Sequence, residues 1–378
     1  MTKFLHTADL QLGMTRHFLD ADAQPRYTQA RFDVIRRIGE LAAAEGCAFI
    51  LVGGDVFESN LLDRKTVIQS LDAMSTIPVP VFLLPGNHDP LNASSIFRSE
   101  TFLSNCPVNV RVLDTSQPVC LEELGVEIVG APWDSKEPLD DLVTKACQGL
   151  TFDPGVVRIV VGHGAVDTVV PGFGKPSVIH ASDVESYIES GIVQYVGLGD
   201  RHSLTEVGST GRFWYSGSPL VTDYDETMPN HVLVVELSAD AVEVTPHLVG
   251  DWRFERQHFD LNNEGDVTAL EEWFERFPDK QRTVVKLDLV GTLSVASAAR
   301  LEAVLDHNAQ RFAAIEQSER ASDLHVMPDD ADLSTLAVSG FARSALEELL
   351  SAAREESPDG EEARDALGLL FRLSGGSK

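Results

Sequence analysis

The sequence lacks the features that mark membrane and secreted proteins. No run approaches the roughly 20 apolar residues that a membrane-spanning helix needs. The first residues, MTKFLHTADL, are polar where a secretory signal would be apolar. Only four cysteines occur in 378 residues, and no two of them form a CxxC pair. We therefore expect a cytoplasmic protein with reduced thiols, no disulfide framework and no membrane association.

Basic residues are also scarce. Thirty Lys and Arg residues stand against 59 Asp and Glu residues, which gives a formal net charge of −29. A protein that binds DNA through its own surface usually presents a basic stripe, because neutralising phosphates supplies much of the affinity. Composition by itself therefore argues against DNA. It favours a small substrate, or a site where metal ions and a partner supply the attraction.

The length exceeds what one small core requires, and it predicts two or three domains. In the first 250 residues, short apolar runs alternate with amphipathic stretches such as 29–45 and 64–75, which is typical of βαβ units. Expected strands are 4–8, 48–53, 79–84, 126–130, 158–162 and 193–198. The runs 213–216, 232–237 and 242–248 follow with no helix between them, so we expect an antiparallel continuation. The predicted fold is α/β, a two-sheet β-sandwich flanked by helices, for residues 1–250.

Beyond residue 250 the pattern changes. Strands are expected at 253–261 and 283–289, and helices at 267–277 and 297–312, which together predict a small α/β capping domain over residues 251–318. Residues 319–378 are predicted to be an acidic linker, including 328–332, followed by C-terminal helices at 339–355 and 361–373. An apolar stripe, Leu346, Leu349 and Leu350, is either core or a surface that docks a partner.

Five polar blocks follow the apolar runs, most of them beside glycine or proline. They are Asp9-Leu-Gln11, Gly53-Gly-Asp55, Gly86-Asn-His-Asp89, Gly162-His-Gly164 and Gly199-Asp-Arg-His202. In α/β sheets, functional groups gather beyond the carboxyl ends of the strands. Oxygen and imidazole donors that converge from several strands suit a binuclear metal site. The blocks predict such a site, and the alternative is a doubly wound fold with ordinary polar loops.

In order and type, these blocks resemble the DxH, GD, GNHD, GH and GHxH pattern of the calcineurin-like metallophosphoesterases. The family fold is a β-sandwich flanked by helices, with two metal ions at one end. The resemblance implies that Asp9 is a carboxylate ligand of the first metal and that Asp55 bridges both metals. It also implies that Asn87 and His163 are ligands of the second metal and that His202 is the last ligand of the first. His88 would stay off the metals and act as the general acid.

Within that family, some segments are similar to the SbcD branch of DNA repair exonuclease subunits. They are FLHTADLQLG, GGDVFESN, LLPGNHDP and Tyr215-Ser-Gly-Ser-Pro219. The similarity covers the first 240 residues well and the rest in outline. It implies a hydrolase that cleaves DNA with an SMC-like ATPase as partner, and it allows a homodimer. Two alternatives stay open: a small-substrate phosphoesterase, which the net charge favours, and a scaffold subunit with a weakened site.

The chain departs from the family pattern at two expected ligands. Gln11 stands where histidine is usual, and Asp200 stands at the first histidine of GHxH. Both keep an oxygen lone pair, so we expect both to ligate and the two divalent ions to be Mn, with Mg as the alternative. Arg201 lies between two expected ligands, where it either contacts a substrate phosphate or forms a surface ion pair. Asp89 either orients a neighbouring group or caps a helix, and His6 is expected to be a packed strand residue.

Overall fold

The computed structural model describes residues 1–172, 174–326 and 341–353, together with residues 357, 359–360, 362–363 and 366–367. The chain divides into two compact units. Unit 1 contains Met1–Arg16 and Gln24–Trp252, and unit 2 contains His17–Ala23 with the described residues from Arg253 onward. The three-part division with boundaries at residues 250 and 318 stays a prediction.

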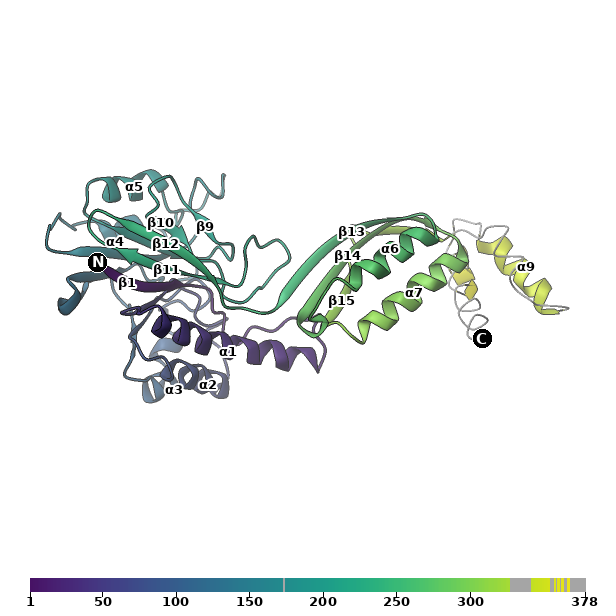
Figure 1. The fold of residues 1–378 in the computed structure, drawn as a ribbon, viewed down its shortest axis with the longest axis horizontal. Helices are drawn as coiled ribbons and strands as arrows, with labels where there is room; N and C mark the ends of the chain where they lie inside the picture. Colours follow the sequence, from purple (N-terminus) through teal and green to yellow (C-terminus); the bar gives the residue numbers. More distant parts are fainter. Residues whose placement is uncertain are drawn as a thin grey trace. The chain divides into compact units, whose positions relative to one another are not determined.

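Unit 1 is built from two six-stranded sheets (Figure 1). The first has the order β12-β11-β1-β2-β3-β4, in which β1 to β4 are parallel and β11 and β12 continue antiparallel. Its strands are β1 (Thr2–Thr7), β2 (Ile50–Val52), β3 (Val81–Leu83), β4 (Val110–Val112), β11 (His231–Leu237) and β12 (Val242–Leu248). The second sheet has the order β5-β6-β7-β8-β10-β9, parallel from β6 to β10. Its strands are β5 (Val119–Leu121), β6 (Val126–Gly130), β7 (Val157–His163), β8 (Tyr195–Gly199), β9 (Thr205–Glu206) and β10 (Phe213–Tyr215).

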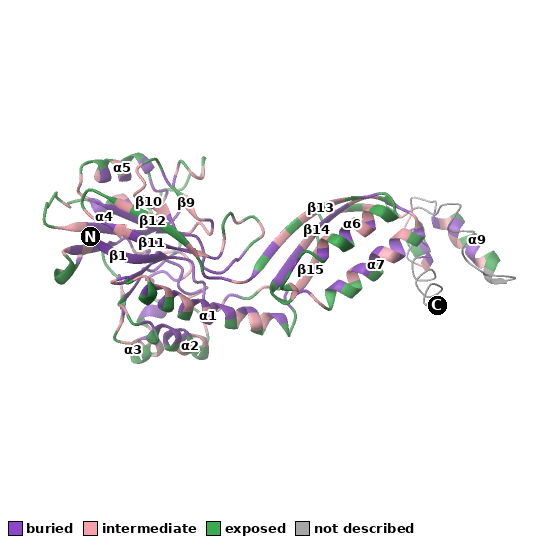
Figure 2. Ribbon diagram, viewed as in Figure 1, coloured by how far each residue is buried: buried purple, intermediate pink, exposed green. Residues whose placement is uncertain are grey.

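The two sheets share one core. Phe4 of β1 stacks on Phe49 with ring centroids 5.1 Å apart, and it meets the ring of Tyr195 of β8 edge-on at 5.4 Å. These rings belong to one buried cluster that also takes in apolar side chains of β2, β3, β6, β7 and β11. Burial of this surface from both sides holds the sheets face to face as a sandwich. The central strands are accordingly the most buried parts of the ribbon (Figure 2).

Helices cover the outer faces of the sandwich. They are α1 (Ala23–Ala44), α2 (Arg64–Ser75), α3 (Glu100–Asn105), α4 (Leu142–Cys147) and α5 (Ala181–Glu189). Helix α2 is capped at its N-terminus by Asp63, which accepts a hydrogen bond from the Thr66 backbone N–H at 3.0 Å. It buries Val67 and Leu71 on one face. Val143 of α4 and Val184 of α5 are buried with Leu198 against the second sheet. Short 3₁₀ turns lie at Ile96–Arg98 and Glu122–Leu124.

Unit 2 is a parallel sheet with helices packed on it. Its elements are β13 (Arg253–Leu261), α6 (Glu264–Phe274), a 3₁₀ turn (Lys280–Arg282), β14 (Thr283–Leu293), α7 (Val295–Ala309), β15 (Ala314–Gln317), β16 (Asp323–Val326) and α9 (Phe341–Ala353). Leu346 and Leu350 of α9 are buried with Val295, so these two leucines belong to a core. The acidic segment 328–332 lies outside the described residues, as does most of the expected helix 361–373.

The predicted fold class is confirmed, with three corrections to its details. The strand at 213–216 does not continue the antiparallel edge, because β10 pairs in parallel with β8 in the other sheet. Residues 319–326 are not all linker, since β16 pairs with β14. The short strands β4, β5, β9, β15 and β16 were not predicted, because they lie outside the apolar runs that identified the other strands. None of the described helices combines the length and apolar character needed to cross a bilayer.

Candidate metal centre

The expected ligands come together at one end of the sandwich, from both sheets. Asp9, Asp55 and Asn87 follow β1, β2 and β3 of the first sheet. His163 ends β7 of the second sheet, and Asp200 follows β8 directly. Asp9, Asp55 and His163 each offer one ligand atom, and these atoms all lie within 4.8 Å of one another. This arrangement agrees with the rule that functional groups gather at the carboxyl ends of parallel strands.

Backbone contacts between the loops hold these side chains in place. The N–H of Asp9 donates to the Gly54 carbonyl at 3.0 Å, and the N–H of Gln11 donates to the Asp55 carbonyl at 2.9 Å. The loops after β1 and β2 therefore run side by side beyond the strands. Gly86 permits a further close approach, because a Cβ there would lie 2.2 Å from Oδ1 of Asp55.

Backbone strain is concentrated at the same residues. Among the described residues that are not glycine, six have a positive φ, and four of them are expected ligands. Their φ angles are 52° at Asp9, 44° at Gln11, 50° at Asp55 and 93° at Asp200. Such conformations cost energy outside glycine, and they persist where the surroundings fix them, often at functional sites. The strain marks these four positions independently of their side-chain chemistry.

His163 presents one nitrogen to the cluster. Its Nδ1 lies 2.9 Å from the Gly53 carbonyl, which can only accept, so Nδ1 carries the hydrogen. Its Nε2 faces Oδ1 of Asp55 at 3.4 Å and Oδ1 of Asp200 at 3.7 Å. The Asn87 side-chain oxygen lies 2.8 Å from the same nitrogen, and with the amide turned over its nitrogen would donate to Asp55 Oδ2 at 2.9 Å. The Nε2 atom of the ring and several oxygens thus converge on one point, as they would around a cation.

A second group of donors surrounds His202. Its Nδ1 lies 2.6 Å from the Thr222 hydroxyl and 3.2 Å from Oε1 of Glu226. Because the carboxylate of Glu226 accepts, Nδ1 is the protonated nitrogen and Nε2 keeps a lone pair. The amide nitrogen of Gln11 lies 3.1 Å from that Nε2. The Gln11 oxygen is buried with no hydrogen-bond partner among the described residues, so it is available to a cation.

The electrostatics of the cluster call for positive charge. Burial raises the pKa of Asp9 to about 6, although His202 and His163 oppose the shift. Burial disfavours the charged ring of His163, but Asp55 and its neighbours outweigh burial and raise the pKa of His163 well above its usual value. In return, the nearby His163 ring overcomes burial and lowers the pKa of Asp55. Buried carboxylates and imidazoles with shifted pKa values are typical of functional sites. The residues present fit divalent metal ions.

Three other predicted residues lie around the centre. His88 places Nδ1 3.0 Å from the Glu58 carbonyl and Nε2 3.9 Å from Oδ2 of Asp55, with 38% of its side chain exposed. Arg201 donates from Nε to the Thr205 hydroxyl at 2.9 Å and lines a cavity of about 300 Å³ beside His202. Asp89 is fully buried and accepts from the backbone N–H groups of Gly86 and Phe57. It ties two loops together, and the idea that it caps a helix is wrong.

His6 is a packed strand residue, as expected. It is fully buried, and its Nδ1 lies 3.0 Å from the Tyr195 hydroxyl. Two residues at the centre were not found from the sequence: Glu226, and Trp133, whose indole N–H donates to the His163 carbonyl at 2.7 Å. Trp133 follows β6, so the rule about strand ends would have found it if it had been applied to that strand. Nothing in the acidic run 223–226 distinguishes Glu226 from its neighbours.

The match to one protein family agrees with this geometry. Residues 2–179 match the family model of the calcineurin-like phosphoesterases. That stretch includes Asp9, Asp55, Asn87 and His163, whereas Asp200 and His202 lie beyond it. Among solved structures, that of TT1561 from Thermus thermophilus is 12% identical, with a TM-score of 0.42, over 65% of this chain and 98% of that one. A second solved structure is 14% identical, with a TM-score of 0.38, over 66% of this chain and 99% of that one.

Proposed function

We propose that the protein is a metal-dependent nuclease subunit that hydrolyses phosphodiester bonds in DNA, on the premise that residues 2–179 match the family model of the calcineurin-like phosphoesterases. One observation carries the hydrolytic part of the proposal. Asp9, Asp55 and His163 bring three ligand atoms within 4.8 Å at the carboxyl end of a sandwich, inside a domain whose family uses divalent metals. Metal-dependent phosphoester hydrolysis follows from the family and the site together.

Each ligand has a place in this mechanism. Asp9, Gln11 and His202 would hold one divalent ion, Asn87, His163 and Asp200 the other, and Asp55 would contact both. When bound, the ions supply positive charge that polarises the phosphoryl group and activates water.

The remaining steps fall to side chains of the protein. The Glu58 carbonyl accepts from Nδ1 of His88, which fixes the ring and leaves Nε2 directed into the site. From that position, a protonated His88 can donate its Nε2 hydrogen to the leaving oxygen. Glu226 holds His202 in the tautomer that presents Nε2.

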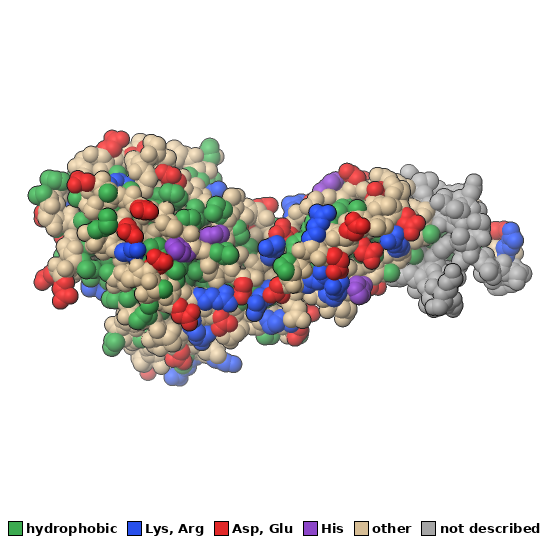
Figure 3. Space-filling view, in the orientation of Figure 1, with side chains coloured by type: hydrophobic (Ala, Val, Ile, Leu, Met, Phe, Trp, Pro, Cys, Tyr) green, Lys and Arg blue, Asp and Glu red, His purple; other side chains and the backbone are tan. Residues whose placement is uncertain are grey.

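DNA as the substrate is supported by the similarity of the motifs to the SbcD branch. Acidic, basic and apolar side chains are interspersed on the face seen in Figure 3. The total charge nevertheless favours a second candidate function, the hydrolysis of small phosphoesters. We further propose Mn as the native metal, because most of the expected ligands offer carboxylate or amide oxygen and only His163 and His202 offer nitrogen.

Hydrolysis of three substrates separates the candidates. Bis-p-nitrophenyl phosphate, its monoester and a DNA duplex would be compared after treatment with EDTA and re-addition of Mn. We expect the diester and DNA to be cleaved only with metal, and Asp55→Ala to abolish both activities. Asp63→Ala is the control, since Asp63 is an exposed residue that caps α2 and should leave the rate unchanged. Cleavage of the monoester alone would favour a small substrate, and unchanged rates in EDTA would exclude the metal mechanism.

We also propose an SMC-like ATPase as partner, on the motif similarity alone. Residues after 328 are the proposed docking element. A chain that ends at Pro328 should still hydrolyse bis-p-nitrophenyl phosphate but fail to co-purify with the ATPase encoded in the same genome. Because Leu346 and Leu350 are buried with Val295, circular dichroism must show that the shortened chain stays folded. Retention of the ATPase by a folded, shortened chain would refute the docking role.

A further inference from the structure

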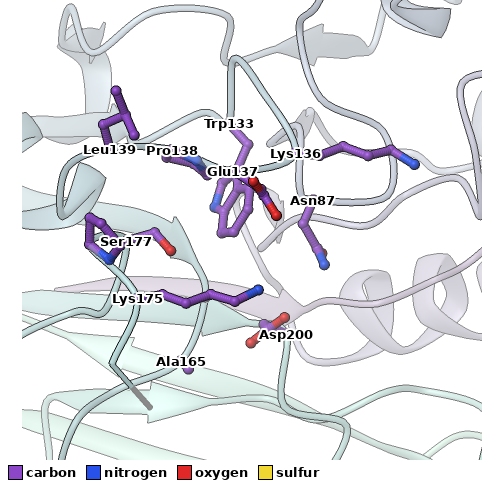
Figure 4. Close-up of a pocket in the computed structure, with 12 residues that line it drawn as sticks. Asn87, Trp133, Lys136, Glu137, Pro138, Leu139, Ala165, Lys175, Ser177 and Asp200 are labelled. Carbon is purple, nitrogen blue, oxygen red and sulfur yellow. The ribbon is translucent and has the colours of Figure 1, made fainter.

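A cavity of about 240 Å³ opens directly on the candidate metal centre (Figure 4). Two expected ligands, Asn87 and Asp200, form part of its wall. The rest of the wall comes from two loops, one after β6 that carries Trp133 and Lys136, and one after β7 that carries Lys175. If a phosphate is held at the centre, the chemical group attached to that phosphate lies beside this cavity.

One wall of the cavity is apolar and fixed to the centre. Trp133 is 7% exposed, and its indole N–H donates to the His163 carbonyl at 2.7 Å. Its ring also meets the His163 ring edge-on at 5.9 Å. Pro138, Pro176 and Leu139, which is 81% exposed, extend this wall outward. An apolar surface set beside charged ligands suits a substrate with a flat or apolar group next to its phosphate.

Basic side chains are also present at the same cavity. The sequence holds only eight lysines, and two of them, Lys136 and Lys175, line it. Figure 4 shows Lys175 below Trp133, reaching toward Asp200, and Lys136 to the right of Trp133, above Asn87. Glu137 and Asp200 are the acidic residues of the same wall, so the lining carries two charged groups of each sign. In a chain of net charge −29, two ammonium groups at this place favour an anion in addition to the one at the centre.

We propose that this cavity binds the nucleoside next to the scissile phosphate, and that Lys136 and Lys175 bind the neighbouring phosphate of the same strand. The volume is below the roughly 300 to 1,000 Å³ of pockets for drug-sized ligands, so it takes one nucleoside and not a longer stretch of strand. This inference rests on the proposed function and makes it more specific. The two lysines are specificity residues, which select a strand that carries neighbouring phosphates over an isolated diester.

The test compares substrates that differ by one phosphate. Dithymidylate with and without a terminal phosphate, at either end, would be assayed beside bis-p-nitrophenyl phosphate, which has no neighbouring phosphate. We expect the terminal phosphate to raise kcat/KM roughly tenfold or more in the parent protein, with a steep dependence on salt. The double variant Lys136→Ala/Lys175→Ala should lose this preference and part of the salt dependence. Its rate on bis-p-nitrophenyl phosphate, measured in parallel, is the reference against which the preference is calculated.

Two matched variants define the control. Lys145→Ala removes a lysine of α4 that pairs with Asp140 at 2.6 Å and does not line the cavity, so the preference should remain. Lys136→Arg/Lys175→Arg keeps both charges and should keep the preference. Binding of a fluorescent dithymidylate with a terminal phosphate, followed by anisotropy in EDTA at low salt, gives a readout that needs no catalysis. The double alanine variant should bind it roughly tenfold or more weakly than the parent.

The outcomes are distinct. If the double alanine variant keeps the preference for the terminal phosphate, or binds the dinucleotide as tightly as the parent does, the cavity does not hold a neighbouring phosphate and the inference is wrong. If the parent hydrolyses none of the diesters, the proposed function fails. The anisotropy comparison still decides the role of the lysines in that case.

Discussion

Stability at acid pH should depend measurably on His6. The ring is fully buried between the two sheets, and burial lowers its pKa from 6.5 to about 3. Above pH 6.5, the ring is neutral in both the folded and the unfolded chain, so it adds no pH dependence. Between pH 6.5 and about 3, the unfolded chain binds a proton that the folded chain excludes. Stability therefore falls as the pH falls, by at most about 1.4 kcal/mol per pH unit.

The expected loss from His6 is about 2 kcal/mol between pH 7 and pH 5. His6→Gln removes the titrating group, while its amide can still hydrogen-bond the Tyr195 hydroxyl, which lies 3.0 Å from Nδ1 in the parent. The variant should be less stable than the parent at pH 7, because the amide packs differently. The difference between their free energies of unfolding should shrink by about 2 kcal/mol when the pH is lowered from 7 to 5.

Urea unfolding in EDTA, followed by tryptophan fluorescence, measures this difference. Three of the four tryptophans, Trp133, Trp214 and Trp252, lie in unit 1 with His6. The control is His180→Gln, which makes the same substitution at a histidine whose side chain is 56% exposed and lies outside the shared core. Groups such as Asp9 titrate in parent and variant alike, so they cancel in the comparison. Parallel profiles for the parent and His6→Gln would refute the reasoning.

Other predictions concern the centre itself. His88→Ala should retain both metals and lower the rate by about two to four orders of magnitude, as loss of a general acid does; metal content that falls with activity, by elemental analysis, would instead make His88 a ligand. Glu226→Gln should weaken metal binding about 10- to 100-fold by calorimetry, because it removes the carboxylate that orients the His202 ring; unchanged affinity would leave Glu226 a purely structural role. Gln11→His and Asp200→His, singly and together, should shift the preference from Mn toward Zn in a competition experiment. We expect the parent to be active with Mn and the double variant to be no faster, whereas a large gain from an inert parent would indicate a decayed site.

The sequence was most informative where parallel strands end. The apolar runs before Asp9, Asp55, Asn87, His163 and Asp200 were each recognisable, and parallel strands bring their carboxyl ends to one edge. The structure accordingly places these residues in one cluster. The long elements were equally recognisable, because their periodicity extends over several turns or alternations. Three of them, α2, β12 and β13, have the predicted bounds.

Contacts made through loops could not be predicted in the same way. Glu226 reaches His202 from a residue 24 positions later, through a loop with no periodicity. For Asp89, the sequence offered a helix cap and an orienting role as equals. What decides between them is a hydrogen bond that Asp89 accepts from the backbone N–H of Phe57, in the neighbouring loop. Likewise, β10 joins β8 and not β11, because strand pairing depends on the whole sheet and not on order along the chain.

The division of the ligands between two sheets has a consequence for the exchange of metal ions. Asp9, Asp55 and Asn87 belong to loops of the first sheet, and His163 and Asp200 belong to the second. An ion held by both groups keeps all its ligands only while the sheets stay packed at that end. Brief openings of the sandwich would then be the events that release it, and its residence time would report how often they occur. A substitution deep in the shared core, at Phe4 for example, should thus accelerate metal loss without touching a ligand.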